Sequence, residues 1–215
     1  MVGTRDAAGS RQARAHERKG QVLAAAVQAM ASHGFRGATL EVIADTAGLA
    51  RGHVRYIAGN REDLLIEAAR YFYFGEAALA LTDLAELAAV APLVPTGSDL
   101  SATFDYLFGK FAVPGVENAA VNAFVDAGRT IPAIHDIVSA AYQGLEGSIR
   151  AAIVRDRPGV EEAAVVPVVY GVLTIALGNS YLSDVPELGR RQADARAAAE
   201  QLVGVLARGA APTDG

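Results

Sequence analysis

The chain has 215 residues, 52% hydrophobic and 20% charged, so it can form a packed core and lacks the composition of a disordered protein. It contains no cysteine, which excludes disulfide scaffolds, zinc fingers and thiol nucleophiles and fits a cytoplasmic protein. The net charge of −5 is unevenly distributed: residues 1–61 hold nine Lys/Arg and four Asp/Glu, whereas residues 62–215 hold ten and twenty. This asymmetry favours a DNA-binding domain fused to a domain of another kind, and a solvated basic tail is the alternative.

Apolar residues recur at steps of three and four along most of the chain, which predicts an all-α fold. Glycine and proline separate the periodic segments. The predicted helices span residues 17–33, 40–46, 51–58, 61–74, 77–90, 99–112, 117–128, 132–155, 160–182 and 187–208. We expect residues 1–15 to be a disordered basic arm and residues 210–215 a disordered tail.

The first helix is amphipathic, and the segment after it carries the pattern of a helix-turn-helix. Thr39 is placed to cap a short helix, and Ala44 is small enough for a second helix to cross over it. Gly48 follows where a tight turn needs positive φ, and Val54 would fill the core from the second helix. The outward positions of that helix hold donors and an aromatic ring that suit the major groove, namely Arg51, His53, Arg55 and Tyr56. The alternative is a helical hairpin whose charges are merely solvated.

The order of these motifs resembles the N-terminal domain of the TetR family of transcriptional regulators over residues 18–65. The matching residues are Gly34-Phe35, Thr39, Ile43-Ala44, Ala47-Gly48-Leu49 and Arg61-Glu62-Asp63-Leu64. The chain departs from the family pattern at Ala50, Arg55 and Ala58, where the family usually has Ser, Tyr and Phe. The resemblance implies a three-helix DNA-binding domain over residues 16–61 and a larger helical ligand-binding and dimerisation domain over residues 62–209.

The resemblance also implies the roles of individual residues toward double-stranded DNA. Thr39, Tyr56 and Arg61 would contact phosphates, which set register, and Arg51, His53 and Arg55 would approach base edges, which set sequence choice. Four arginines near the N-terminus either reach DNA as an arm or belong to a floppy tail, namely Arg5, Arg11, Arg14 and Arg18.

The family keeps its ligand cavity in the region that corresponds to residues 77–155. Aromatic side chains that could line an apolar pocket are Phe104, Phe108, Phe111, Phe124, Tyr142 and Tyr170, with Asn122, Asp126 and Thr174 as polar anchors. The alternative is that these aromatics are ordinary core. We interpret the neighbours His135 and Asp136 as a surface pair, and we predict no metal site and no cofactor.

The family forms a homodimer from its last two helices, which residues 160–182 and 187–208 match in position. The uncharged stretch 163–183 is long enough to cross a bilayer. Pro167 and Gly178 interrupt it and acidic residues flank it, so we interpret it as a helix buried between a core and a partner subunit, without a membrane.

The sequence contains no Gly-x-Ser-x-Gly elbow, no phosphate-binding glycine loop and no His-Glu-x-x-His, so we predict no catalytic residues and no enzyme. We predict a homodimeric, sequence-specific regulator of a palindromic operator, a repressor released by an unknown small molecule. The alternatives are an activator, and a helical small-molecule-binding protein or enzyme with a vestigial DNA-binding head.

Overall fold

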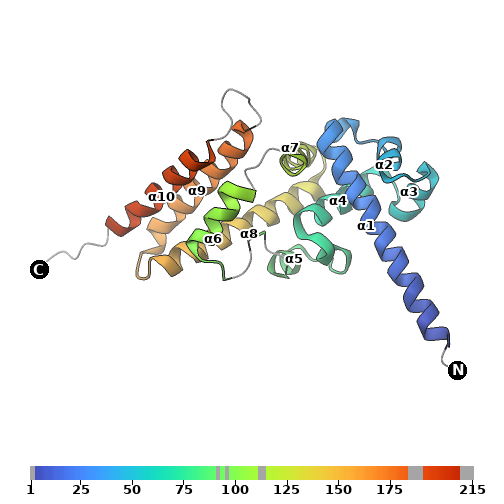
Figure 1. Cartoon of the computed structure of the whole chain (residues 1–215), viewed down its shortest axis with the longest axis horizontal. Coiled ribbons are helices and arrows are strands. Elements are labelled where there is room, and N and C mark those ends of the chain that lie inside the picture. The colour runs from blue at the N-terminus through green and yellow to red at the C-terminus, as the bar shows by residue number, and fades with distance from the viewer. Residues whose placement is uncertain (1–2, 91–92, 95–96, 111–114, 184–190, 209–215) are drawn as a thin grey trace, which may run out of the picture. The chain divides into compact units, whose positions relative to one another are not determined.

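A computed structural model of the chain describes residues 3–90, 93–94, 97–110, 115–183 and 191–208. Within these ranges all regular structure is helical, which confirms the predicted fold class (Figure 1). The elements are α1 (Gly3–Gly37), α2 (Leu40–Ala47), α3 (Arg51–Ala58), α4 (Arg61–Phe74), η1 (Gly75–Leu79), α5 (Leu84–Val90), α6 (Leu100–Asp105), η2 (Tyr106–Lys110), α7 (Val116–Gly128), α8 (Pro132–Asp156), α9 (Glu162–Leu182) and α10 (Gln192–Arg208).

The chain forms two compact units. Unit 1 comprises Met1–Ala91 and Ala119–Ala141, and unit 2 comprises Pro92–Asn118 and Tyr142–Gly215. The predicted domain boundary after residue 61 falls inside unit 1 and stays a prediction.

The first four helices form one core of unit 1. The apolar stripe predicted for the first helix is buried on α1 at Val22, Leu23, Ala26 and Met30. The facing residues of α4 are Leu64, Leu65, Ala68 and Ala69, all of which are fully buried. The ion pair between Lys19 Nζ and Glu67 Oε1, at 3.0 Å, joins the same two helices. These contacts hold α1 and α4 together. Helices α2 and α3 pack against this pair.

Helix α1 begins at Gly3, although residues 1–15 were expected to be disordered. Alanine and arginine are strong helix formers, and they let the helix continue beyond the residues that the core holds (Figure 1). Toward its C-terminal end Gly34, at φ 67°, interrupts the helical backbone, close to the predicted end of this helix at residue 33. The predicted tail, residues 210–215, lies outside the described residues.

The prediction of one helix over 77–90 is wrong, because the chain forms η1 and α5 with a break between them. Asp83 starts the second piece: its Oδ1 accepts a hydrogen bond from the Glu86 amide at 2.8 Å. The Leu81 carbonyl in the break accepts from Arg70 Nη2 at 2.7 Å. Similarly, the helix predicted over 99–112 is α6 followed by the π-helix η2, and its residues 111–112 lie outside the described residues.

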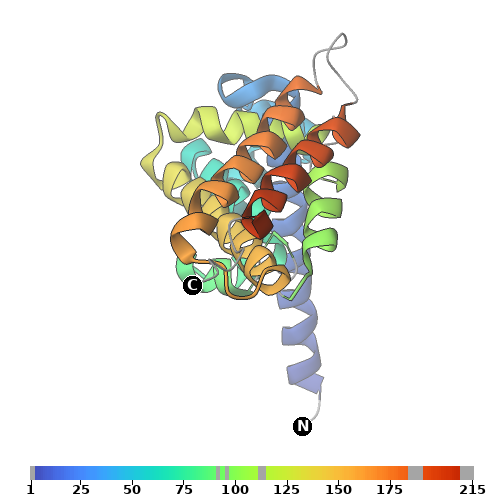
Figure 2. The same cartoon turned by 90° about the vertical axis from the view of Figure 1, so that its left-hand side faces the viewer.

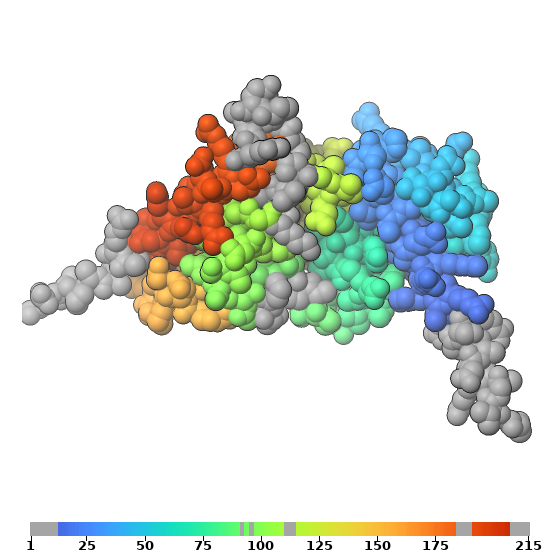
Figure 3. Space-filling model, viewed as in Figure 1, coloured from blue at the N-terminus to red at the C-terminus, as the bar shows by residue number. Residues whose placement is uncertain are grey.

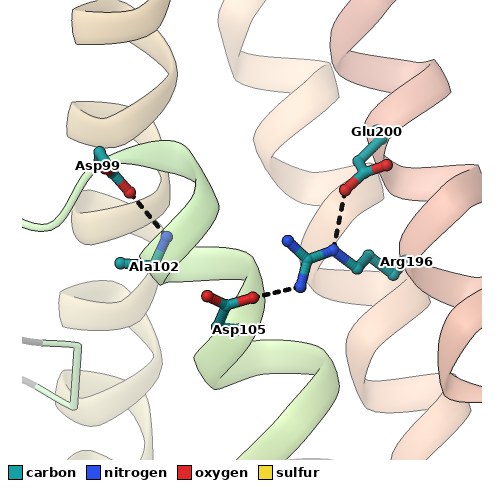
Figure 4. A network of polar contacts seen from close by, with 5 residues as sticks. All are labelled: Asp99, Ala102, Asp105, Arg196 and Glu200. Atoms are coloured by element: carbon teal, nitrogen blue, oxygen red, sulfur yellow. Dashed lines mark hydrogen bonds and ion pairs between the residues drawn. The ribbon is translucent and has the colours of Figure 1, made fainter.

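Unit 2 is built around α9, which packs beside α10 in both views (Figures 1 and 2). Its core includes Phe104, Leu107, Leu145, Ile149, Val169, Val172 and Val203. Helix α10 is also tied to α6, because the Arg196 guanidinium donates to Asp105 Oδ1 and, at 2.8 Å, to Glu200 Oε1 (Figure 4). The start predicted for the last helix, residues 187–190, lies outside the described residues.

By length and composition, α9 is the one helix among the described residues that could cross a membrane, and 44% of its most apolar window is buried inside the chain. Core helices of globular proteins pass the same test. Its place in the core of unit 2 therefore explains part of its apolar character.

Candidate nucleic-acid interface

The predicted helix-turn-helix is formed by α2 and α3. Thr39 caps α2, and its Oγ1 accepts a hydrogen bond from the Val42 amide at 3.2 Å. Gly48 ends α2 in the left-handed region at φ 66°, where glycine has no steric cost. Ala44 and Val54 are buried, which is what a close crossing of the two helices requires. Each of these features follows from the residues that the sequence pattern singled out.

Helix α3 has one face in the core and one face in solvent. Val54 and Ala58 are buried, whereas Arg51, Arg55 and Tyr56 are exposed, and the Tyr56 ring is 88% accessible. His53 is half-buried. The space-filling view shows this segment, coloured light blue to cyan, at the surface of unit 1 (Figure 3). The helix therefore offers cationic donors and an aromatic hydroxyl to a partner outside the chain.

The N-terminus of α3 has no side-chain cap. Ala50 occupies the N-cap position in an extended conformation, and its side chain has no acceptor. Its carbonyl accepts from the His53 amide at 2.8 Å and from the Val54 amide at 3.2 Å. No acidic side chain occurs in the first turn of α3, so no carboxylate of that turn compensates the positive dipole end. An anion such as a phosphate oxygen is electrostatically favoured at such a helix end.

Arg61, predicted to contact phosphate, makes hydrogen bonds inside unit 1, and its phosphate contact stays a prediction. Its Nε donates to the Ala38 carbonyl at 2.8 Å, and its Nη2 donates to the Phe35 carbonyl. The guanidinium also lies over the Phe35 ring, 4.9 Å from the centroid. Partial burial lowers the pKa of Arg61 from its usual value. Thr39 is the other predicted DNA contact outside α3, and it is exposed at the start of α2.

Two further side chains hold the interface and were not identified from the sequence. Gln21 Nε2 donates to the Ala47 carbonyl at 3.1 Å, so α1 supports the end of α2. Lys19, counted only as part of the basic N-terminal segment, pairs with Glu67. Both contacts join residues far apart in the chain, and no local spacing signals them.

The predicted ligand residues are divided between the two units. Phe104 and Phe108 belong to the core of unit 2, with ring centroids 5.6 Å apart. Phe124 is fully buried in unit 1, against Phe72 and Tyr73. The exposed members of the set are Asn122, Asp126, Tyr170 and Thr174. Phe111 lies outside the described residues.

The buried aromatics thus have ordinary core partners, and the described residues of the predicted ligand set are not gathered in one unit. Tyr142 is half-buried against the core of unit 2, and burial raises its pKa. Tyr106, which the sequence did not single out, stands at the start of the π-helix; burial and the nearby Glu117 carboxylate raise its pKa. His135 and Asp136 lie 3.4 Å apart and exposed, and the described residues hold no cluster of three potential metal ligands.

Comparisons with known proteins agree with this geometry. Residues 22–68 match the sequence profile of the family described as bacterial regulatory proteins, tetR family. No curated protein gives a significant match to the sequence. The folds of several solved structures are similar. A TetR transcription regulator from Haloarcula marismortui ATCC 43049 has 18% identity and a TM-score of 0.67, covering 88% of this chain and 97% of its own.

Two other structures extend the comparison. A transcriptional regulator from Rhodococcus sp. Rha1 has 19% identity and a TM-score of 0.62, with coverage of 90% and 99%. The multidrug binding protein EbrR, solved in complex with proflavin, has 15% identity and a TM-score of 0.51, with coverage of 86% and 99%. At these identities the structures establish similarity of fold over most of both chains.

Proposed function

We propose that this chain, whose residues 22–68 form a DNA-binding domain of the tetR family of bacterial regulatory proteins, is a dimeric repressor released from its operator by a small molecule. The observation that carries the proposal is the exposed basic face of α3. Arg51, Arg55 and Tyr56 project from a helix whose opposite face, at Val54 and Ala58, is anchored in the core.

On DNA, Arg51, His53 and Arg55 would read base edges in the major groove, and Thr39 and Tyr56 would contact phosphates. The uncapped first turn of α3 adds a favourable site for a phosphate oxygen. We propose a palindromic operator, because two identical subunits related by a twofold axis present two identical helices to two half-sites.

The dimer would form through α9 and α10. Apolar side chains that are exposed on these helices are Val166 (46% accessible), Tyr170 (67%), Tyr181 (65%), Leu182 and Val205. Contiguous exposed apolar surface is typical of an interaction site. The exposure of Tyr170 and Thr174 therefore favours a role at this surface over a role in a ligand cavity.

The ligand would bind the DNA-bound and the DNA-free conformations of the protein with different affinities. It can shift the equilibrium between these two conformations only by that difference. A similar fold binds a small molecule in the EbrR complex with proflavin. In this chain the aromatic residues around the π-helix, Phe104, Tyr106 and Phe108, together with Tyr142, are the candidates for an apolar ligand site in unit 2.

The test is a fluorescence-anisotropy titration of the full chain with the DNA upstream of its own coding region. We expect a sequence-selective complex that weakens as salt is added, and a loss of selectivity in Arg51→Ala and Arg55→Ala. A control variant, Arg129→Ala, removes an exposed arginine outside the α1–α4 domain and should bind normally. Absence of any selective complex would overturn the proposal, and a reporter assay that shows activation would overturn the repressor role.

A further inference from the structure

Arg61 stands immediately behind the helix-turn-helix, at the first position of α4, yet it reaches back to residues that precede the helix-turn-helix. Its Nε and Nη2 donate to the carbonyls of Ala38 and Phe35, which lie 23 and 26 residues earlier in the chain. The Arg61 side chain thus connects the start of α4 to Phe35 and Ala38, which precede α2 in the chain.

The two carbonyls that Arg61 binds are those that have lost their helical donors. The Thr39 amide, which would serve the Phe35 carbonyl in a continuous helix, donates to the Gly37 carbonyl at 2.8 Å. The Val42 amide, which would serve the Ala38 carbonyl, donates to the Thr39 hydroxyl that caps α2. Capping α2 therefore leaves acceptors open at the end of α1, and Arg61 satisfies them.

Arginine suits this position for reasons that do not involve DNA. Its planar fork can direct two donors at two carbonyls, and its charged carbon lies over the Phe35 ring. A cation is also favoured at the C-terminal end of a helix, where the free carbonyls of α1 concentrate negative partial charge.

We propose that Arg61 is a positioning residue that closes the helix-turn-helix by fixing its two ends to each other, and that it makes no phosphate contact. The proposal rests on the proposed DNA-binding function and adds the means by which α2 and α3 are held for it. Because Arg61 belongs to α4, a displacement of the first turn of α4 would pull on the α1–α2 junction and on the Thr39 cap. The same contact thus gives a direct route from α4 to the DNA-binding surface.

Salt dependence separates positioning from phosphate contact. The slope of log K against log salt falls by about 0.9 for each phosphate charge that a lost cation had neutralised. For Arg61→Met, which keeps a long apolar chain but removes the donors, we expect operator affinity to drop by roughly tenfold with an unchanged slope. Arg51→Ala is the comparison: this side chain is assigned to a base edge, so its removal should appear mainly as a loss of sequence selectivity.

A second measurement needs no DNA and so stands if the proposed function fails. Hydrogen exchange of the free protein should quicken over residues 35–47 in Arg61→Met, while residues 192–203 of α10 keep the wild-type rate. Phe35→Leu removes the ring but keeps the carbonyl, so its effect should be smaller. If Arg61→Met does not fold, Arg61→Lys serves in its place, because it retains the charge without the fork.

The outcomes are distinct. A slope that falls by about 0.9 in Arg61→Met makes Arg61 a phosphate contact and overturns the proposal. Unchanged exchange over residues 35–47 also overturns it, whatever the DNA result. Quickened exchange in a chain that binds no operator sequence keeps the positioning role and rejects the regulatory function.

Discussion

Ala50 at the N-cap of α3 offers no side-chain acceptor to the first turn of this helix, although its carbonyl accepts from the His53 amide at 2.8 Å. By contrast, Thr39 and Asn60 cap the helices on either side, each through a side-chain oxygen that accepts from an amide three residues on. Among α2, α3 and α4, the helix without a side-chain cap at its start is therefore the one proposed to meet DNA. A phosphate oxygen could supply there what the alanine lacks.

Ala50→Ser should raise the free energy of unfolding by about 1 kcal/mol, the usual value of a serine N-cap over alanine. Residue 50 is exposed and its backbone is already extended, so the hydroxyl can reach the first-turn amides without strain. Urea unfolding followed by circular dichroism measures the change. Ala24→Ser, at an exposed position within α1, is the control and should not stabilise the chain.

Burial of tyrosine hydroxyls makes stability depend on pH at the alkaline end. The pKa values of Tyr106 and Tyr142 are raised by burial, so the folded state holds their protons more tightly than the unfolded chain does. The stability they contribute is complete below their ordinary pKa of about 10 and is lost as the pH rises through the folded values.

Tyr142→Phe should therefore flatten the loss of stability above about pH 10, because one of the two groups no longer titrates. At neutral pH the variant should unfold at nearly the same urea concentration as wild type. Urea unfolding across this pH range measures the effect, and Tyr56→Phe, at a ring that is 88% accessible, is the control. Equal alkaline curves for Tyr142→Phe and wild type would contradict the prediction.

At the scale of elements, the sequence predicted the helices whose ends are marked locally. The bounds 51–58 and 61–74 agree with α3 and α4, because Gly48, Gly59 and Asn60 punctuate the chain there. The helix 77–90 was wrong because Asp83, an ordinary polar residue by pattern, caps a new helix. The role of Arg61 could not be predicted, since its acceptors are set by packing across more than twenty residues.

The crossing of α9 and α10 is another feature that packing determines. Gly171 lies where an added Cβ would be 2.5 Å from Leu202 Cδ2, closer than atoms can approach. Glycine inside a helix ordinarily weakens it by about 0.5–1 kcal/mol relative to alanine. The close contact explains why glycine is suited to this position of α9.

Gly171→Ala and Leu202→Ala should consequently be coupled. Alone, Gly171→Ala gains little or loses stability because Leu202 must move; with Leu202→Ala present, the same change should stabilise by about 0.5–1 kcal/mol. Urea unfolding of the four chains at one protein concentration gives the coupling energy. Gly147→Ala on α8, where an added Cβ meets nothing within 4 Å, should stabilise the chain both with and without Leu202→Ala. Additive effects of the two substitutions would contradict the close packing.

For the whole molecule, the sequence has a basic N-terminal region and an acidic remainder, and the helix-turn-helix lies in unit 1; the domain boundary inferred from this asymmetry stays a prediction. The predicted ligand residues stay a prediction, because aromatic spacing along a helix does not distinguish a cavity wall from a core. Phe104 and Phe124, predicted together, are buried in different units. Assembly is a property of two chains, so one sequence can only indicate which surface is left apolar.

That surface provides the last prediction. Tyr170→Glu places a charge at the 67% accessible position near the middle of α9. Burial of an unpaired carboxylate between subunits costs several kcal/mol, on the order of a thousandfold or more in a dimer constant, so the variant should sediment as a monomer at concentrations where wild type is dimeric. Its own fold should persist, because residue 170 is 67% accessible within one subunit. Operator affinity should then fall and become steeply dependent on protein concentration, since each half-site is bound separately.

Val154→Glu, at an exposed position of α8, should leave both measurements unchanged. A Tyr170→Glu protein that stayed dimeric would show that the subunits meet elsewhere, and the apolar face of α9 would need another partner.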